Sequence, residues 1–370
     1  MRNPPLPIAD GLNPSRVRVE HSGSARVIVR HLIDTQQHHD PTDDDTALRE
    51  RFAEGLVRLD DGTRLSPTSV VPAGEFIWFY RRPAPERVVP GELREIHRDE
   101  HLLVVDKPTF MSTLPRGQHI TETAVVRARR QFGLSTLSPA HRLDRLTRGV
   151  LLFTVDPSVR GAYQRLFEAR EVVKSYEAVT PVPAGWFSSG DSLEGTTDES
   201  FPVPAGALGY RSPATVLDAP TEDAPWVLRH RMIKLRGRMA TYLEAGEPNS
   251  ETRVTGVRLV RRSAPGNGGA SGEGGVSSEC IAGDDAVVWT LEPHSGRTHQ
   301  LRVNMRLFGV PIVNDPLYGP LSDEALWDVD APMPFVPAVA DEDFSAPMGL
   351  TAAAMRFIDP LSGEPREFER

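Results

Sequence analysis

The apolar side chains of the first eighty residues recur at intervals that predict two helices and a closing strand. Helical spacing covers residues 26–33 and 48–56, and residues 74–80 have the composition of a strand. We therefore expect a small α+β domain over residues 15–88. The preceding residues 1–14 contain four prolines and few apolar neighbours, which predicts a loose tail.

A second hydrophobic pattern begins beyond a proline-containing linker at residues 82–90 and predicts alternating strands and helices. The predicted elements are a buried strand at 102–108, a helix near 122–132, a strand at 150–155, a helix at 157–167 capped by Asp156, strands at 172–179 and 287–291, and a helix from Ser295 to Phe308. Leu301 and Met305 share the buried face of the last helix. The pattern indicates a larger domain over residues 95–370.

Two stretches interrupt this larger domain and are predicted to be insertions. Residues 181–230 are rich in Pro, Gly and acidic side chains, and residues 261–279 contain a glycine-rich run. That run lacks the Gly-Lys-Ser/Thr ending of a phosphate-binding loop and opens no clear helix, which favours a linker.

Composition narrows the class of protein. The chain has 370 residues, 39% hydrophobic and 25% charged, as is typical of globular proteins of about two domains. No stretch approaches the roughly 20 apolar residues that span a bilayer, and the first residues lack a secretion signal, so we expect a cytoplasmic protein without membrane contact. The single cysteine, Cys280, rules out an internal disulfide and a clustered thiolate metal site.

The net charge of −9 by itself disfavours a nucleic-acid partner, but the charges are unevenly distributed along the chain. Residues 321–370 hold eleven acidic side chains against three arginines, which is nearly all of the excess. Residues 135–177 instead hold seven basic groups against five acidic ones. A locally basic face on an acidic protein can bind a polyanion, because the field near a cleft depends on nearby charges.

The densest candidate chemistry is the run His-Arg-Leu-Asp-Arg-Leu-Thr-Arg-Gly at residues 141–149, directly before the apolar run at 150–153. Nearby guanidinium groups favour the ionised form of Asp144, so this residue is a candidate nucleophile, and the arginines suit phosphate. A structural Asp paired with Arg is the alternative, and the local sequence leaves it open.

Other candidates lie on the later elements. Tyr176 shares a strand face with Lys174 and can serve as a stacking platform for a base, while Arg302 can hold Asp144 charged and oriented. Taken singly, Tyr176 also fits a core position and Arg302 a solvated face. The histidines, including His299, have no metal-binding spacing, so we expect polar contacts and no metal.

Together these segments resemble the pseudouridine synthases of the RluA class. The signature regions are the arginine-rich run at 141–149, the Lys-Ser-Tyr of 174–176, and the block at 296–319 that begins Gly-Arg-Thr-His-Gln-Leu-Arg and ends Asn-Asp-Pro-Leu-Tyr-Gly. The resemblance covers most of residues 95–370 apart from the insertions. It implies an α+β catalytic domain with a mixed, largely antiparallel sheet and an RNA cleft.

The resemblance also implies roles for individual residues. Asp144 becomes the nucleophile toward a uridine, through carbon 6 of the base or the anomeric carbon of the ribose. Tyr176 stacks on the uracil, Arg302 forms a salt bridge with the aspartate, and Leu301 is an apolar contact near the pocket. Arg142 fills the gap that the flipped uridine leaves in the RNA. No cofactor or metal is implied.

Further RNA contacts are expected from Arg145, Lys174, Arg297 and His299. The chain departs from the family pattern at four positions, which are Leu146, Arg148, Asn304 and Asn314. Arg148 stands where the family usually has Ser, and we expect it to alter RNA contact. The N-terminal unit weakly resembles the ribosomal-protein-type RNA-binding module that often precedes this domain, but its first half lacks the usual basic helix.

The sequence therefore predicts a monomeric RNA pseudouridine synthase that flips and isomerises uridines in structured RNA, with rRNA favoured over tRNA. Two alternatives stay open. One is a catalytically silent RNA-binding or ribosome-assembly protein of the same fold. The other is a hydrolase that releases the base, which would need a second carboxylate as a general acid or base.

Overall fold

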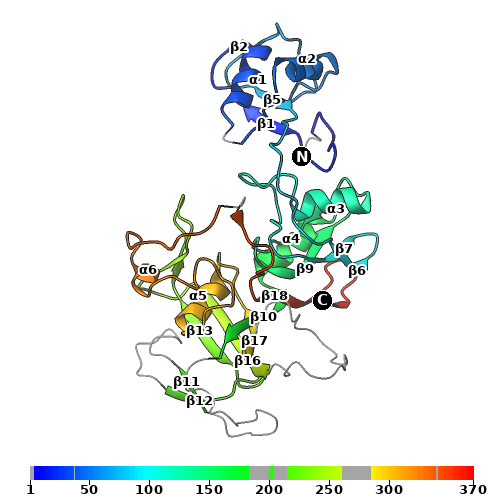
Figure 1. Ribbon diagram of the computed structural model, residues 1–370. Coiled ribbons are helices and arrows are strands. Elements are labelled where there is room, and N and C mark those ends of the chain that lie inside the picture. Colours follow the sequence, from blue (N-terminus) through cyan, green and yellow to red (C-terminus); the bar gives the residue numbers. More distant parts are fainter. Residues whose placement is uncertain (1–3, 37, 183–199, 204–214, 261–284, 339–340) are drawn as a thin grey trace, which may run out of the picture.

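The computed structural model describes residues 4–36, 38–182, 200–203, 215–260, 285–338 and 341–370. Figure 1 shows a small N-terminal unit joined by an extended segment to a larger unit that holds the rest of the chain. Within the described residues, no helix combines the length and the apolarity that crossing a membrane requires.

The small unit packs two helices against a three-stranded sheet. Its elements are β1 (Ser15–Arg18), β2 (Gly23–Ser24), α1 (Ala25–Asp34), α2 (Asp45–Ala53), β3 (Arg58–Leu59), β4 (Val70–Val71) and β5 (Phe76–Phe79). The strands β1, β5 and β3 pair antiparallel, with β5 in the centre. The predicted helices and closing strand are confirmed, although α2 begins earlier because the Asp44 carboxylate accepts hydrogen bonds from the amides of Thr46 and Ala47.

The large unit is organised around one ten-stranded sheet. Its elements are β6 (Arg94–Arg98), β7 (Leu102–Lys107), α3 (Ala124–Phe132), β8 (Ser138–Pro139), β9 (Arg148–Thr154), α4 (Arg160–Ala169), β10 (Val173–Pro181), β13 (Trp226–His230), β16 (Ser250–Val260), β17 (Ala286–Pro293), α5 (Gln300–Leu307), β18 (Leu350–Ile358) and β19 (Pro365–Glu369). The strand order is β13-β16-β17-β10-β18-β9-β7-β6, with β19 beside β18 and β8 beside β9. Among the described strands of this sheet, every pairing is antiparallel except that of β18 with β9. The predicted mixed, largely antiparallel sheet is therefore confirmed.

Short elements complete the large unit. They are the hairpin of β11 (Ser200–Val203) and β12 (Thr215–Asp218), the hairpin of β14 (Met232–Ile233) and β15 (Tyr242–Leu243), and α6 (Glu324–Trp327). Much of the insertion expected at 181–230, and all of the insertion expected at 261–279, lie outside the described residues. The end of the first insertion was misplaced, because residues 226–230 form β13, whose Trp226 and Leu228 are buried against the sheet.

Both faces of the sheet are covered, which explains the uninterrupted apolar runs in the sequence. Along β7 and β9 successive side chains enter opposite cores. Leu103, Leu151 and Phe153 pack with residues of α3 and α5 on one face. Leu102 and Leu152, with their neighbours, pack with α4 on the other face.

Two helices begin later than their sequence signals predict. The Asp156 carboxylate accepts from the amide and hydroxyl of Ser158 in a preceding turn, so α4 starts only at Arg160. The Ser295 hydroxyl donates to Oε1 of Gln300 (2.8 Å), and α5 starts at Gln300. In both cases the predicted capping side chain makes other hydrogen bonds and does not accept from the first amides of the helix. Asp156 accepts from Ser158, and Ser295 donates to the Gln300 side chain.

The described part of the predicted tail, residues 4–14, makes specific contacts and differs from the loose segment that its prolines suggested. Leu6 is buried. From α3, the Arg129 guanidinium donates to the Gly11 carbonyl (2.8 Å), and Arg130 forms an ion pair with Asp10 (2.6 Å). Two guanidinium groups on one helix thus satisfy backbone and side-chain oxygens of the segment and fasten it to the large unit.

Candidate active site

Asp144 lies in the loop between β8 and β9, and buried hydrogen bonds hold this loop in place. Thr113 makes two hydrogen bonds to Leu143, the residue before Asp144. The Thr113 hydroxyl donates to the Leu143 carbonyl (2.7 Å) and accepts from the Leu143 amide (3.0 Å). The Thr147 amide donates to the Asp144 carbonyl and closes the turn. The Asp144 carboxylate itself makes no hydrogen bond or ion pair with any residue in the described part of the chain, and so stays available to a substrate.

Lys107 lies buried beneath the same loop at the end of β7. Its ammonium donates to the carbonyls of Pro108 and Met111 (both 2.8 Å) and of Arg145 (3.4 Å). Burial lowers the pKa of Lys107 to about 7, although the nearby Asp144 charge opposes this shift. The lysine therefore links the loop that holds Asp144 to the end of β7.

Gly149 sets where the loop enters β9. Its φ is +113°, and a Cβ built on it would lie 2.1 Å from the Ala352 carbonyl oxygen. The strands β9 and β18 pair parallel here, with Gly149 opposite Ala352. Only glycine permits this approach, so the glycine that closes the arginine-rich run has a backbone role.

Tyr176 lies on β10, between β17 and β18. The register between β10 and β18 shifts between Ser175 and Tyr176, because Ala353 of β18 has no partner on β10. Burial, together with the Asp144 charge, raises the pKa of the Tyr176 phenol, which stays protonated at neutral pH. Lys174, two residues earlier on the same strand face, lines one cavity together with Tyr176.

Arg302 does not form the salt bridge that the resemblance implied. Its guanidinium donates two hydrogen bonds to Asp315, from Nε (2.7 Å) and Nη2 (2.6 Å), and both residues are buried. No ion pair joins Arg302 to Asp144 among the described residues. The two still interact electrostatically, because the Asp144 charge contributes to the raised pKa of Arg302, after the opposing effect of burial and the larger effect of Asp315.

A second buried network surrounds His299. Its Nδ1 lies 3.0 Å from the Tyr318 hydroxyl, which also accepts from the Thr241 amide (2.8 Å). Burial, and then the Arg302 charge, lower the pKa of His299 to about 4, so the imidazole is neutral at pH 7. The Arg302 guanidinium lies over the Tyr318 ring, 4.9 Å from its centroid.

One cavity of about 580 Å³ brings together residues from three distant parts of the sequence. Asp144, Tyr176 and Arg302 all line it. Of the predicted RNA contacts, those that also line the cavity are Arg142, Lys174, Arg297, His299 and Leu301. The lining carries five Arg or Lys side chains (Arg142, Arg170, Lys174, Arg297 and Arg302) against three carboxylates (Asp144, Glu168 and Glu292), a positive balance that favours a polyanion.

Two arginines of the run 141–149 point elsewhere. Arg145 does not line the cavity and forms a two-bond ion pair with Glu342 (2.5 and 2.8 Å). Arg148 is 5% exposed, and its Nε donates to the Thr351 hydroxyl (2.9 Å). The expected effect of Arg148 on RNA contact is therefore wrong, because the side chain is buried within the sheet.

Sequence reasoning missed three residues that support the site: Lys107, Thr113 and Asp315. Lys107 could have been noticed as a cation at the end of an apolar strand. Asp315 belongs to a block quoted above, but its partner is thirteen residues away on α5. Within the described ranges, no group of three or more His, Cys, Asp or Glu side chains is arranged to hold a metal ion.

Comparison with known proteins identifies the family. The profile of the RNA pseudouridylate synthase family matches residues 101–307. An RNA pseudouridine synthase of Synechocystis is 26% identical over 74% of this chain and 74% of its own length. The dual-specificity RNA pseudouridine synthase RluA of Haemophilus ducreyi (26% identical, 61% of this chain and 77% of its own) and the tRNA pseudouridine synthase C of Vibrio cholerae (26%, 74% and 88%) are similar.

Among solved structures, human RNA pseudouridylate synthase domain containing 1 matches with a TM-score of 0.45 and 21% identity over 76% of this chain and 85% of that one. The family profile covers more than half of the chain. The chain belongs to the RNA pseudouridylate synthase family, in the RluA class, as the signature regions predicted. It is thus an isomerase of the pseudouridine-forming kind.

Proposed function

We propose that the protein converts uridine to pseudouridine in structured RNA, with Asp144 as the nucleophile. The observation that carries the proposal is the common cavity of Asp144, Tyr176 and Arg302. A carboxylate that pairs with no residue in the described part of the chain, in a cavity with surplus positive charge, is suited to attack an electron-poor carbon of a bound nucleotide.

The reaction balances without a cofactor. Asp144 attacks carbon 6 of the uracil or the anomeric carbon of the ribose, and the bond from N1 to the anomeric carbon breaks. The uracil rotates while it is held, and carbon 5 bonds to the anomeric carbon. The bond to Asp144 breaks, by displacement at the anomeric carbon in that step or by later elimination from carbon 6, which frees the carboxylate. Carbon 5 loses a proton and N1 gains one. Tyr176 stacks on the uracil as a neutral phenol, and Arg302, held by Asp315, stabilises negative charge near Asp144.

Base flipping belongs to the same proposal. A stacked uridine cannot reach Asp144, so it must leave the helix, and Arg142 is exposed at the rim two residues before the nucleophile. We propose that Arg142 fills the vacated position and that Lys174, Arg297 and His299 contact the flipped nucleotide or its phosphates. Arg145 is left out of this set because it is paired with Glu342.

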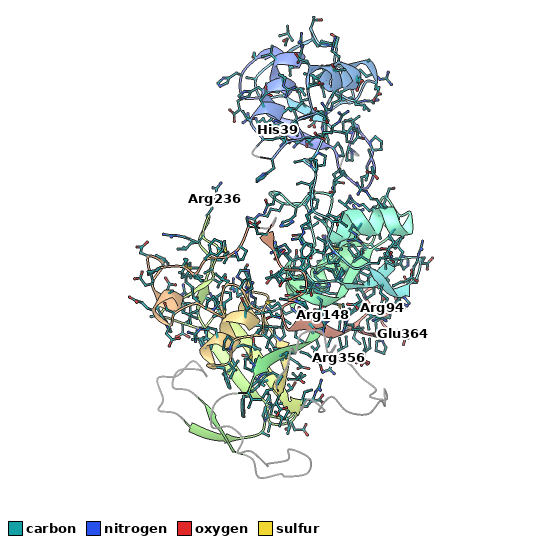
Figure 2. All side chains as sticks on the ribbon, in the orientation of Figure 1. His39, Arg94, Arg148, Arg236, Arg356 and Glu364 are labelled. Carbon is teal, nitrogen blue, oxygen red and sulfur yellow. The ribbon has the colours of Figure 1, made fainter. Side chains whose placement is uncertain are left out.

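A cationic hairpin beside the cavity supports an RNA substrate. Lys234, Arg236 and Arg238 are exposed in the loop between β14 and β15. Figure 2 shows Arg236 projecting away from the body of the large unit. Burial and then the Arg116 charge lower the pKa of Lys234, and the Asp144 charge opposes this shift. We propose that the exposed cations of this loop contact RNA that flanks the target uridine.

Hydrolysis of the same bond is less well supported. Of the other carboxylates that line the cavity, Glu168 is exposed on α4 and Glu292 lies 3.6 Å from Arg356. Neither is a buried proton donor next to Asp144. Free uracil in the product would nevertheless detect this reaction, and a pseudouridine assay of the same sample separates the two activities.

The decisive test is the Asp144→Asn variant of the full chain, assayed on rRNA and tRNA from cells that lack the protein. We expect wild type to restore pseudouridine at specific positions, mapped by chemical labelling, with rRNA sites ahead of tRNA sites. The variant should bind RNA within about twofold of wild type and form no product, since only the nucleophile is lost. Comparable turnover by the variant would refute the role of Asp144, and binding without any turnover by wild type would favour the silent RNA-binding alternative.

A further inference from the structure

The outer face of the small N-terminal sheet carries aromatic side chains that the core of that unit does not use. Successive residues of a strand point to opposite faces. In β5, Ile77 and Phe79 are fully buried in the core of the unit. Phe76 and Trp78 alternate with them, are half-buried, and take no part in that hydrophobic cluster.

Arginines flank these rings in register. Trp78 pairs with Arg16 of β1 on one side and with Arg58 of β3 on the other. Arg58 is in turn bridged to Arg64. Because directly paired residues of antiparallel strands share a face, these four side chains form one row across the sheet. In the next row Arg18 pairs with Phe76.

Part of this surface is already ordered. Asp60 accepts from Nε and Nη2 of Arg16 (2.9 and 2.6 Å) and from Nε1 of Trp78 (2.6 Å). The Arg16 guanidinium lies 3.4 Å from the centroid of the Phe76 ring. One carboxylate therefore holds a stacked guanidinium and the edge of an indole in place, which lowers the entropy cost of binding a planar group.

The remaining cations of the face are not neutralised. Among the residues that the structure describes, Arg18, Arg58 and Arg64 form no ion pair with a carboxylate. The helical side of the unit differs, because residues 26–54 carry seven acidic side chains against four arginines. The positive charge of the unit is thus concentrated on its sheet, and Figure 1 shows β1 and β5 on the side of the unit nearer the large unit in this view.

We propose that this arginine–tryptophan face, made of Arg16, Arg18, Arg58, Arg64, Phe76 and Trp78, binds unpaired nucleotides of the substrate RNA outside the catalytic cavity. Bases stack on Trp78 and on the Arg16 guanidinium, while Arg18, Arg58 and Arg64 contact phosphates. Stacking and cationic contacts of this kind hold single strands with little sequence preference. The inference rests on the proposed function in one respect, that the substrate is RNA.

The test measures binding of the full chain to a labelled single-stranded RNA of mixed sequence by fluorescence anisotropy over a salt series. Arg58→Ala/Arg64→Ala should bind about tenfold more weakly, with a salt slope less steep by about 1.4, the value for two lost phosphate contacts on a single strand. The matched control, Arg26→Ala/Arg49→Ala, removes two exposed arginines from the helical side and should bind as wild type does. Equal losses in both pairs would overturn the proposal, because a general charge effect would explain them.

A second pair of variants separates stacking from folding. Trp78→Ala should weaken binding by about tenfold, and Trp78→Phe, which keeps a ring, should restore most of it. Wild-type affinity for Trp78→Ala and for Arg58→Ala/Arg64→Ala, with unchanged thermal unfolding, would overturn the proposal and leave the face to a protein partner. The binding assay does not require turnover. The proposal for this face can therefore be refuted while Asp144-dependent pseudouridine formation is observed, and RNA binding by the face can be observed while pseudouridine formation is not.

Discussion

Asp315 holds Arg302 through two short hydrogen bonds, and Arg302 lines the same cavity as Asp144. The side chains are 0% and 6% exposed, respectively. The Asp315 carboxylate also accepts from the amides of Leu317 and Tyr318 (3.0 and 2.9 Å). Asp315, itself held by these two amides, fixes the Arg302 guanidinium. We therefore expect Arg302 to keep its position whether or not substrate is bound.

Asp315→Asn should therefore impair both stability and turnover. Removing one partner of a buried pair leaves an uncompensated charge and costs about 3–5 kcal/mol. The matched control is Asp323→Asn, which breaks an exposed ion pair with Arg306 on the same helix and should cost less than about 1 kcal/mol. Urea unfolding and single-turnover assays check this. Equal losses for the two variants would show that the Arg302–Asp315 pair has no special role.

Gly149→Ala should disrupt the junction of β9 and β18. The added Cβ would overlap the Ala352 carbonyl, so we expect a loss of about 3 kcal/mol or more in the free energy of unfolding. Gly62→Ala is the control, since Gly62 also has a positive φ (+89°) but no atom near its Cβ, and it should cost about 1–2 kcal/mol. Thermal unfolding of both variants shows whether the contact with Ala352, in addition to the positive φ, makes glycine necessary at position 149.

Lys107 should make stability rise with pH above neutrality. Its pKa is about 7 in the folded state against 10.5 in the reference, so the unfolded chain binds more protons between these values. The free energy of unfolding then increases as pH rises from about 7 to 10.5, and the full penalty for the buried charge is present below about pH 7. Lys107→Met should remove this slope. Parallel stability curves for wild type and variant, from urea titrations at several pH values, would contradict the prediction.

Arg142→Ala should slow the reaction most where the target uridine is stacked. The side chain is exposed, so we expect thermal unfolding to be unchanged. In the proposed role Arg142 replaces the flipped base, so its loss should lower kcat/KM by about 10-fold to 100-fold for a uridine inside a stem, and by much less for the same uridine in a bulge. A uniform loss on both RNAs would indicate a phosphate contact instead.

Local sequence was sufficient for the parts of this protein that depend on near neighbours. The apolar spacing predicted both helices of the small unit and the main strands of the large one, because burial on both sheet faces imposes a readable pattern. The signature regions also predicted the family, and they contain Asp144 and Tyr176, which line one cavity, since chemistry restricts residue type at fixed local spacing.

Only the tertiary structure decided which charges meet. The sequence offered several arginines to Asp144, but Arg302 is paired with Asp315, Arg145 with Glu342, and Arg148 is buried beside Thr351. Pairing over such separations depends on how strands are ordered in the sheet, which short-range patterns do not encode. For the same reason, the row of Arg16, Trp78, Arg58 and Arg64 is visible only once β1, β5 and β3 lie side by side.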